Sequence, residues 1–70
     1  MSKAAQLLQE EIDNYSKDLQ QWESRKRQVE QGIFVPAKIL GQEACLQIAE
    51  TNIRFLTEII DTLVKVQAKL

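Results

Sequence analysis

Residues 31–42 read QGIFVPAKILGQ, and this stretch decides the fold of the 70-residue chain. It contains both glycines and the only proline of a sequence otherwise rich in helix-forming residues. Gly32 suits the left-handed position that ends a helix, and Pro36 suits the first turn of the next helix. The pattern therefore predicts an all-α fold, an antiparallel two-helix hairpin in which the chain turns back at Phe34.

The predicted hairpin is a single domain over residues 1–70, with a helix at 3–31, a turn at 32–35 and a helix at 36–70. Ser2 is the expected N-cap of the first helix. An alternative starts the second helix at Gly41. The earlier start is favoured because Ile39 continues the apolar pattern of the second helix only if that helix runs back through Gly41, and because connections between helices are usually short.

Both predicted helices carry apolar residues at alternating spacings of three and four, the pattern of a coiled-coil seam. The seam of the first helix comprises Ala5, Leu8, Ile12, Tyr15, Leu19, Trp22 and Val29. The seam of the second comprises Ile39, Leu46, Ala49, Ile53, Leu56, Ile60 and Leu63. For a turn at Phe34, the numbers of facing residues sum to about 68, so Val29 would face Ile39. Lys26 would then face Gln42. The two seams predict helices packed on each other, within one chain or swapped between two.

The second helix has a further row of residues at the same spacing, here called the surplus row: Cys45, Ile48, Asn52, Phe55, Ile59, Thr62 and Val66. The first helix has too narrow an apolar face to cover both rows, and an uncovered apolar row marks an interaction surface. Three readings are open: a second copy covers the row, which would make a dimeric four-helix bundle; a different helical protein covers it; or the chain is a monomer whose row stays exposed to water. Asn52 either fixes the register of that contact or faces water.

The candidate partner-binding residues are Cys45, Ile48, Asn52, Phe55, Ile59, Val66 and Phe34. Phe34 either folds back to cap the end of the hairpin or inserts into a partner as an aromatic anchor. Cys45 is either a reactive thiol or, as its apolar row favours, a small buried side chain.

The composition argues against an enzyme. The chain has no histidine, one cysteine and a net charge of −1, and it shows no nucleophile, nucleotide-loop or metal-ligand motif. We therefore expect no catalytic residues, no cofactor, no metal and no small-molecule substrate. The one basic run, Arg25–Arg27, is the only candidate for nucleic-acid binding, but it lies among acidic residues and is expected to be a solvated helix face. No apolar stretch is long enough to cross a membrane. Together with the single cysteine, this favours the cytoplasm.

The expected function is a protein–protein interaction module, an adaptor or small chaperone subunit that self-associates or docks on a larger helical partner. An alternative is a small inhibitor of the kind encoded by phages and mobile elements, which binds and blocks a host protein. In its size and in the short turn between two amphipathic helices, the predicted hairpin resembles the co-chaperones of type III secretion needle subunits. That resemblance implies packing against the helical repeats of a partner.

Overall fold

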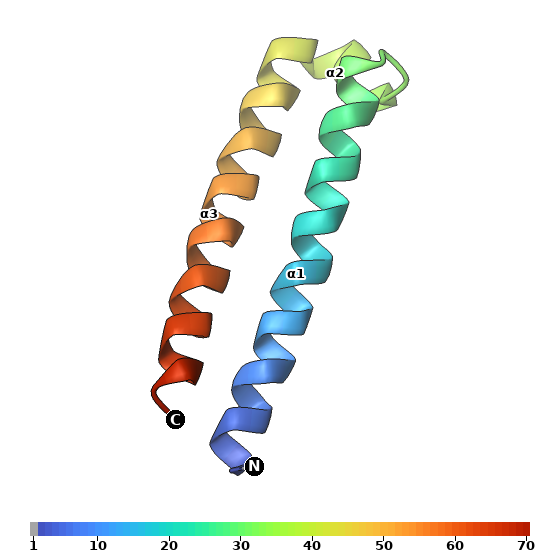
Figure 1. Cartoon of the computed structure of the whole chain (residues 1–70). Helices are drawn as coiled ribbons and strands as arrows, with labels where there is room; N and C mark the ends of the chain where they lie inside the picture. The colour runs from blue at the N-terminus through green and yellow to red at the C-terminus, as the bar shows by residue number, and fades with distance from the viewer. Residues whose placement is uncertain (1) are drawn as a thin grey trace.

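The computed structural model describes residues 2–70, which form three helices: α1 (Lys3–Glu30), α2 (Val35–Leu40) and α3 (Gln42–Ala68). The two long helices, α1 and α3, pack side by side in opposite directions, with both chain ends at the same end of the molecule (Figure 1). The rod measures 47 × 15 × 14 Å. The all-helical prediction and the packing of two long helices are thus confirmed. The predicted domain also included Met1, which lies outside the described residues.

Both ends of α1 have the caps that the sequence predicts. The Oγ of Ser2 accepts a hydrogen bond of 3.1 Å from the backbone N–H of Ala5. At the other end Gly32 has φ +77°, and the next N–H, that of Ile33, donates to the Gln28 carbonyl at 3.0 Å. A glycine adopts this left-handed conformation without the steric cost that a Cβ would add.

The prediction of one continuous helix over residues 36–70 is wrong. A helical segment does begin early, at Val35, but it ends at Leu40 because Gly41 has φ +97° and ψ 141°, a conformation outside the helical region. A new helix begins at Gln42 and ends at Ala68. The short α2 crosses the closed end of the hairpin between the two long helices (Figure 1). The chain therefore changes direction twice at this end, once at Gly32 and once at Gly41.

This break moves Ile39 out of the seam. Its side chain is 84% exposed, whereas Val29, which it was predicted to face, is 1% exposed. The polar layer was also wrongly assigned: Lys26 Nζ lies 3.6 Å from Glu50 Oε1, and the side-chain amide of Gln42 donates instead to the Val29 carbonyl at 3.0 Å.

The pairing between α1 and α3 is shifted from the prediction, by about one heptad along the packed length of the helices and by less at the closed end. The side-chain contacts between the long helices join Gln9 to Gln67, Lys26 to Glu50 and Gln42 to the backbone of Val29. Their residue numbers sum to between 71 and 76, rather than to about 68. A shift of seven residues carries each seam position onto another seam position. The same residues therefore face inward, as the burial of Ile12, Ala49 and Leu56 shows, although their partners change.

Candidate protein-binding surface

One side of α3 presents exposed apolar side chains along most of its length. The four large apolar members of the surplus row and their exposed fractions are Ile48 (49%), Phe55 (58%), Ile59 (36%) and Val66 (43%). They lie next to the seam of α3, which packs against α1, and they recur at the three-and-four spacing that keeps residues on one side of a helix. The structure therefore places these four predicted residues on one continuous line.

The polar members of the surplus row bond to their own helix. The side-chain amide of Asn52 donates to the Ile48 carbonyl at 2.9 Å, and the hydroxyl of Thr62 donates to the Glu58 carbonyl at 2.9 Å. A buried donor without an acceptor destabilises an interface. The Thr62 hydroxyl donor therefore stays paired when the row is covered, whereas the second N–H and the carbonyl oxygen of the Asn52 amide need partners in the covering surface.

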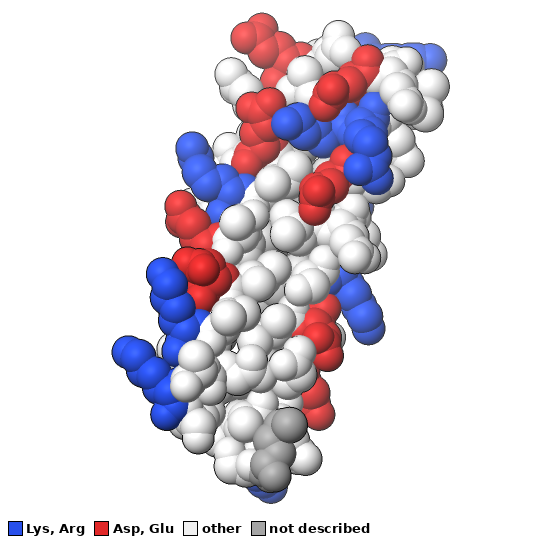
Figure 2. Space-filling view, in the orientation of Figure 1, with Lys and Arg blue, Asp and Glu red and all other residues white. Residues whose placement is uncertain are grey.

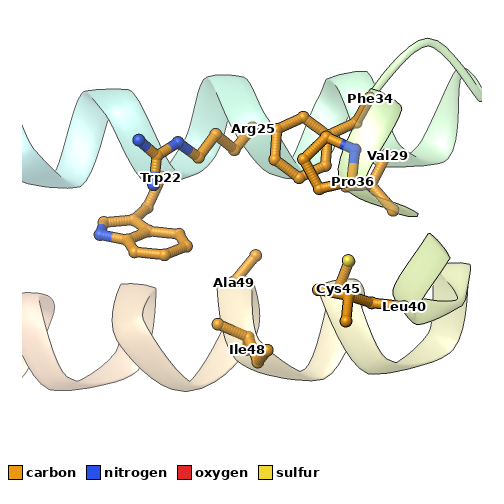
Figure 3. Close-up of a pocket in the computed structure, with 9 residues that line it drawn as sticks. All are labelled: Trp22, Arg25, Val29, Phe34, Pro36, Leu40, Cys45, Ile48 and Ala49. Atoms are coloured by element: carbon orange, nitrogen blue, oxygen red, sulfur yellow. The ribbon is translucent and has the colours of Figure 1, made fainter. Parts of the chain in front are cut away.

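Cys45 lies in the core of the closed end rather than on the exposed surface. Only 7% of the residue is exposed, and it lines a cavity together with Trp22, Val29 and Ala49 (Figure 3). The reason is its position in the first turn of α3, where residues of the turn and α2 cover the helix end. The interpretation of Cys45 as a small buried side chain agrees with this placement, and its assignment to a partner-binding surface does not.

Phe34 is half-buried and folds back toward α1, where it lines the same cavity as Val29 and Pro36 (Figure 3). This position corresponds to the predicted cap of the hairpin end rather than to a protruding anchor. The apolar residues that do protrude at this end were not predicted as a surface: Ile33, Val35, Ile39 and Leu40. If Gly41 is taken as the end of a helix, most of these residues are predicted to be exposed, because the short helix α2 cannot form a coiled-coil seam.

The cavity at the closed end has a volume of about 170 Å³ and lies between α1, α2 and α3. Its lining is apolar apart from the Cys45 thiol and Arg25, whose guanidinium lies 4.7 Å from the centroid of the Trp22 ring. A stacked guanidinium of this kind interacts favourably with the ring face. Arg25 therefore covers Trp22 at one edge of the cavity.

The basic run Arg25–Arg27 does not form a continuous basic patch. Arg25 stacks on Trp22, Lys26 reaches Glu50 on α3, and consecutive residues point in different directions around a helix. Figure 2 shows Lys and Arg side chains mixed with Asp and Glu near the closed end and along the outer flanks of the hairpin. The face in that view carries charges of both signs.

Within residues 2–70 no cluster of three His, Cys, Asp or Glu side chains could hold a metal ion, and no helix is long and apolar enough to cross a membrane. No protein-family model, curated protein or solved structure matches the chain. What the described residues do offer is the exposed part of the surplus row.

Proposed function

We propose that this chain is a non-enzymatic protein–protein interaction module that binds another helix through the surplus row of α3. The observation that carries the proposal is the line of four exposed apolar side chains from Ile48 to Val66. At a rise of 1.5 Å per residue, this line is roughly 27 Å long. In the cell the module would act as an adaptor or as a small chaperone subunit of a larger helical assembly, and its single thiol suits the cytoplasm.

A helix is the ligand that suits this row. Side chains repeating every seven residues form the knobs that fit between side chains of a facing helix, and amphipathic helices dock through such lines of anchors. Fully burying one large apolar side chain contributes roughly 1.5–3 kcal/mol. The four residues of the row are 36–58% exposed, so covering each would contribute roughly half of that amount, and together they still favour a helix–helix interface.

The small core of the hairpin also supports binding to a partner. The buried apolar residues of the described chain are Ile12, Val29, Cys45, Ala49 and Leu56. A domain of this length is marginally stable from its own core and is commonly stabilised by oligomerisation, metals or disulfides. Cys45 is a free cysteine, so a disulfide does not supply that stability. Covering the surplus row would add apolar burial on α3 from Ile48 to Val66.

The test compares Phe55→Asp with Thr57→Asp in the full chain. The two positions are separated by about 200° around α3, so the same charge is placed on the surplus row or away from it. The measurement is the set of protein chains that co-purify with each variant, whether copies of this chain or other proteins. We expect Phe55→Asp to lose these chains and Thr57→Asp to keep them. Circular dichroism checks that both variants are folded. A folded Phe55→Asp protein that retains every bound chain would overturn the proposal.

A further inference from the structure

We infer that the occupant of the surplus row is a second copy of this chain, with the two α3 helices antiparallel about a twofold axis that passes between the two rows at the height of Thr57. This inference rests on the proposed function and names the partner of the same surface. Three observations support it: the area that the hairpin exposes, the polarity of the other surfaces that could cover the row, and the complementarity between the row and a second, antiparallel copy of itself.

The area exposed by one hairpin exceeds that of an ordinary folded monomer by the amount that a dimer would cover. The chain exposes 5284 Å² for a mass of 8.1 kDa. A compact monomer of that mass exposes about 4,500 Å². The excess, about 800 Å², is close to the area that each partner contributes to a standard protein–protein interface. The excess arises because the rod is only two helices wide, and lengthwise pairing of two rods would remove it.

The surface of α1 that flanks the surplus row carries charges along most of its length, with Leu7 as its exposed apolar residue near the N-terminal end, and this surface suits the row poorly in a second copy. Arg25 on α1 and Ile48 on α3 line the same closed-end cavity, so Arg25 lies at the edge of α1 that borders this end of the row (Figure 3). Asp18 and Glu11 precede it at intervals of seven and therefore share that side of α1. Packing this polar line on the row of another copy would bury charges against apolar side chains, which is costly. The apolar counterpart with the same length and spacing is the row itself.

The row matches itself best in the antiparallel direction. When the numbers of facing residues sum to about 114, Phe55 faces Ile59 of the second copy and Ile48 faces its Val66, each contact occurring twice by symmetry. In the same register Asn52 faces Thr62, so polar residues share a layer. A register shifted by one heptad toward the closed end would place Asn52 against Phe55. The polarity of the row therefore selects one alignment.

The charges beside the row agree with this direction. Arg54 and Glu58 flank the row on its outer side. Close to the proposed axis the two Glu58 carboxylates approach each other, and Arg54 of each copy lies near Glu58 of the other, so each carboxylate has a cationic neighbour. A parallel alignment would instead set identical charges at the same height, including Lys65 beside Lys65, which is unfavourable.

The first experiment is the mass of the full chain by light scattering behind a sizing column. We expect twice the chain mass for the wild type, the chain mass for Phe55→Asp and twice the chain mass for Thr57→Asp. A wild-type chain that is monomeric across the micromolar range overturns the second-copy inference. The proposed function would still stand if Phe55→Asp then loses a different bound protein, so the two failures are distinguishable.

The second experiment tests the alignment by crosslinking single cysteines with a short bismaleimide in a Cys45→Ala background that circular dichroism shows to be folded. We expect Glu58→Cys, close to the axis and beside the row, to yield a crosslinked dimer. Two control variants should not yield the crosslinked dimer. Thr57→Cys lies at the same height but on the far side of α3, and Lys65→Cys lies far from the axis. Efficient crosslinking of Lys65→Cys would overturn the antiparallel direction. Efficient crosslinking of Thr57→Cys would overturn packing through the row.

Discussion

The two apolar rows of α3 have the same spacing but different surroundings. In the seam, Ala49 and Leu56 are buried against α1, whereas Phe55, one residue before Leu56, is 58% exposed. Both rows run along the same helix with the period of a coiled coil. The difference comes from α1. Its apolar face is wide enough to cover one row only, and the neighbouring side of α1, which carries Glu11, Asp18 and Arg25, is polar. An apolar row is therefore covered or exposed according to what the rest of the chain packs against it.

The largest expected difference between the rows is in stability. Leu56→Ala removes a buried side chain and should lower the free energy of unfolding by about 2–5 kcal/mol. Phe55→Ala, measured at a concentration where the chain is monomeric, should change it by less than about 1 kcal/mol because the residue is exposed there. Urea unfolding followed by the fluorescence of Trp22 gives both values. Equal losses at that concentration would mean that the two rows are covered alike.

The next largest effect is expected at Gly41, where the break between α2 and α3 ends the seam. Gly41→Ala should lower the free energy of unfolding by about 1–3 kcal/mol, because the conformation at φ +97° is strained for a residue with a Cβ. No atom within 4 Å would meet that Cβ, so the loss reports the backbone and not a steric clash. Urea unfolding measures it. A Gly41→Ala protein as stable as its parent would indicate that α2 and α3 can run as one helix, with Ile39 back in the seam.

The parts of the fold that could be predicted from the sequence are those governed by local pattern. Helix formation, the cap at Ser2 and the inward direction of Leu56 all follow from residue type and spacing. The exposed line from Ile48 to Val66 also follows from spacing. These features depend on which side of a helix a residue occupies, and that is set within a few turns.

The parts that could not be predicted depend on the path of the chain at the closed end. Gly41 is compatible with a weak point inside a helix and with a break, and only the packing of α2 against α3 distinguishes them. The heptad shift between α1 and α3 follows from that break, because a seven-residue repeat matches equally well in either register. The burial of Cys45 and the exposure of Ile39 are consequences of the same turn.

A smaller effect tests the contact that replaces the predicted polar layer. The side chain of Gln42 donates to the Val29 carbonyl, which also accepts a hydrogen bond of 3.0 Å from the backbone N–H of Gly32. Gln42→Ala should lower the free energy of unfolding by about 0.5–1.5 kcal/mol. The matched control is Gln47→Ala on the exposed surface of α3, which should change it by less than about 0.5 kcal/mol. Equal changes in chemical denaturation would show that the Gln42 contact does not stabilise the closed end.

The smallest expected effect lies at Lys26, the one charged residue at a seam position of α1. Its ammonium group is 3.6 Å from Glu50, but both side chains are partly exposed, at 36% and 59%, and such ion pairs contribute about 0–1 kcal/mol. Lys26→Leu removes the pair but adds an apolar side chain facing α3, so the two effects oppose each other. We expect a net change in unfolding free energy within about 1 kcal/mol. Glu50→Gln, which removes the pair without adding apolar surface, separates the contributions. A loss above about 2 kcal/mol for Lys26→Leu would exceed the whole contribution of such an ion pair and would mean that the seam does not accept an apolar side chain at this position.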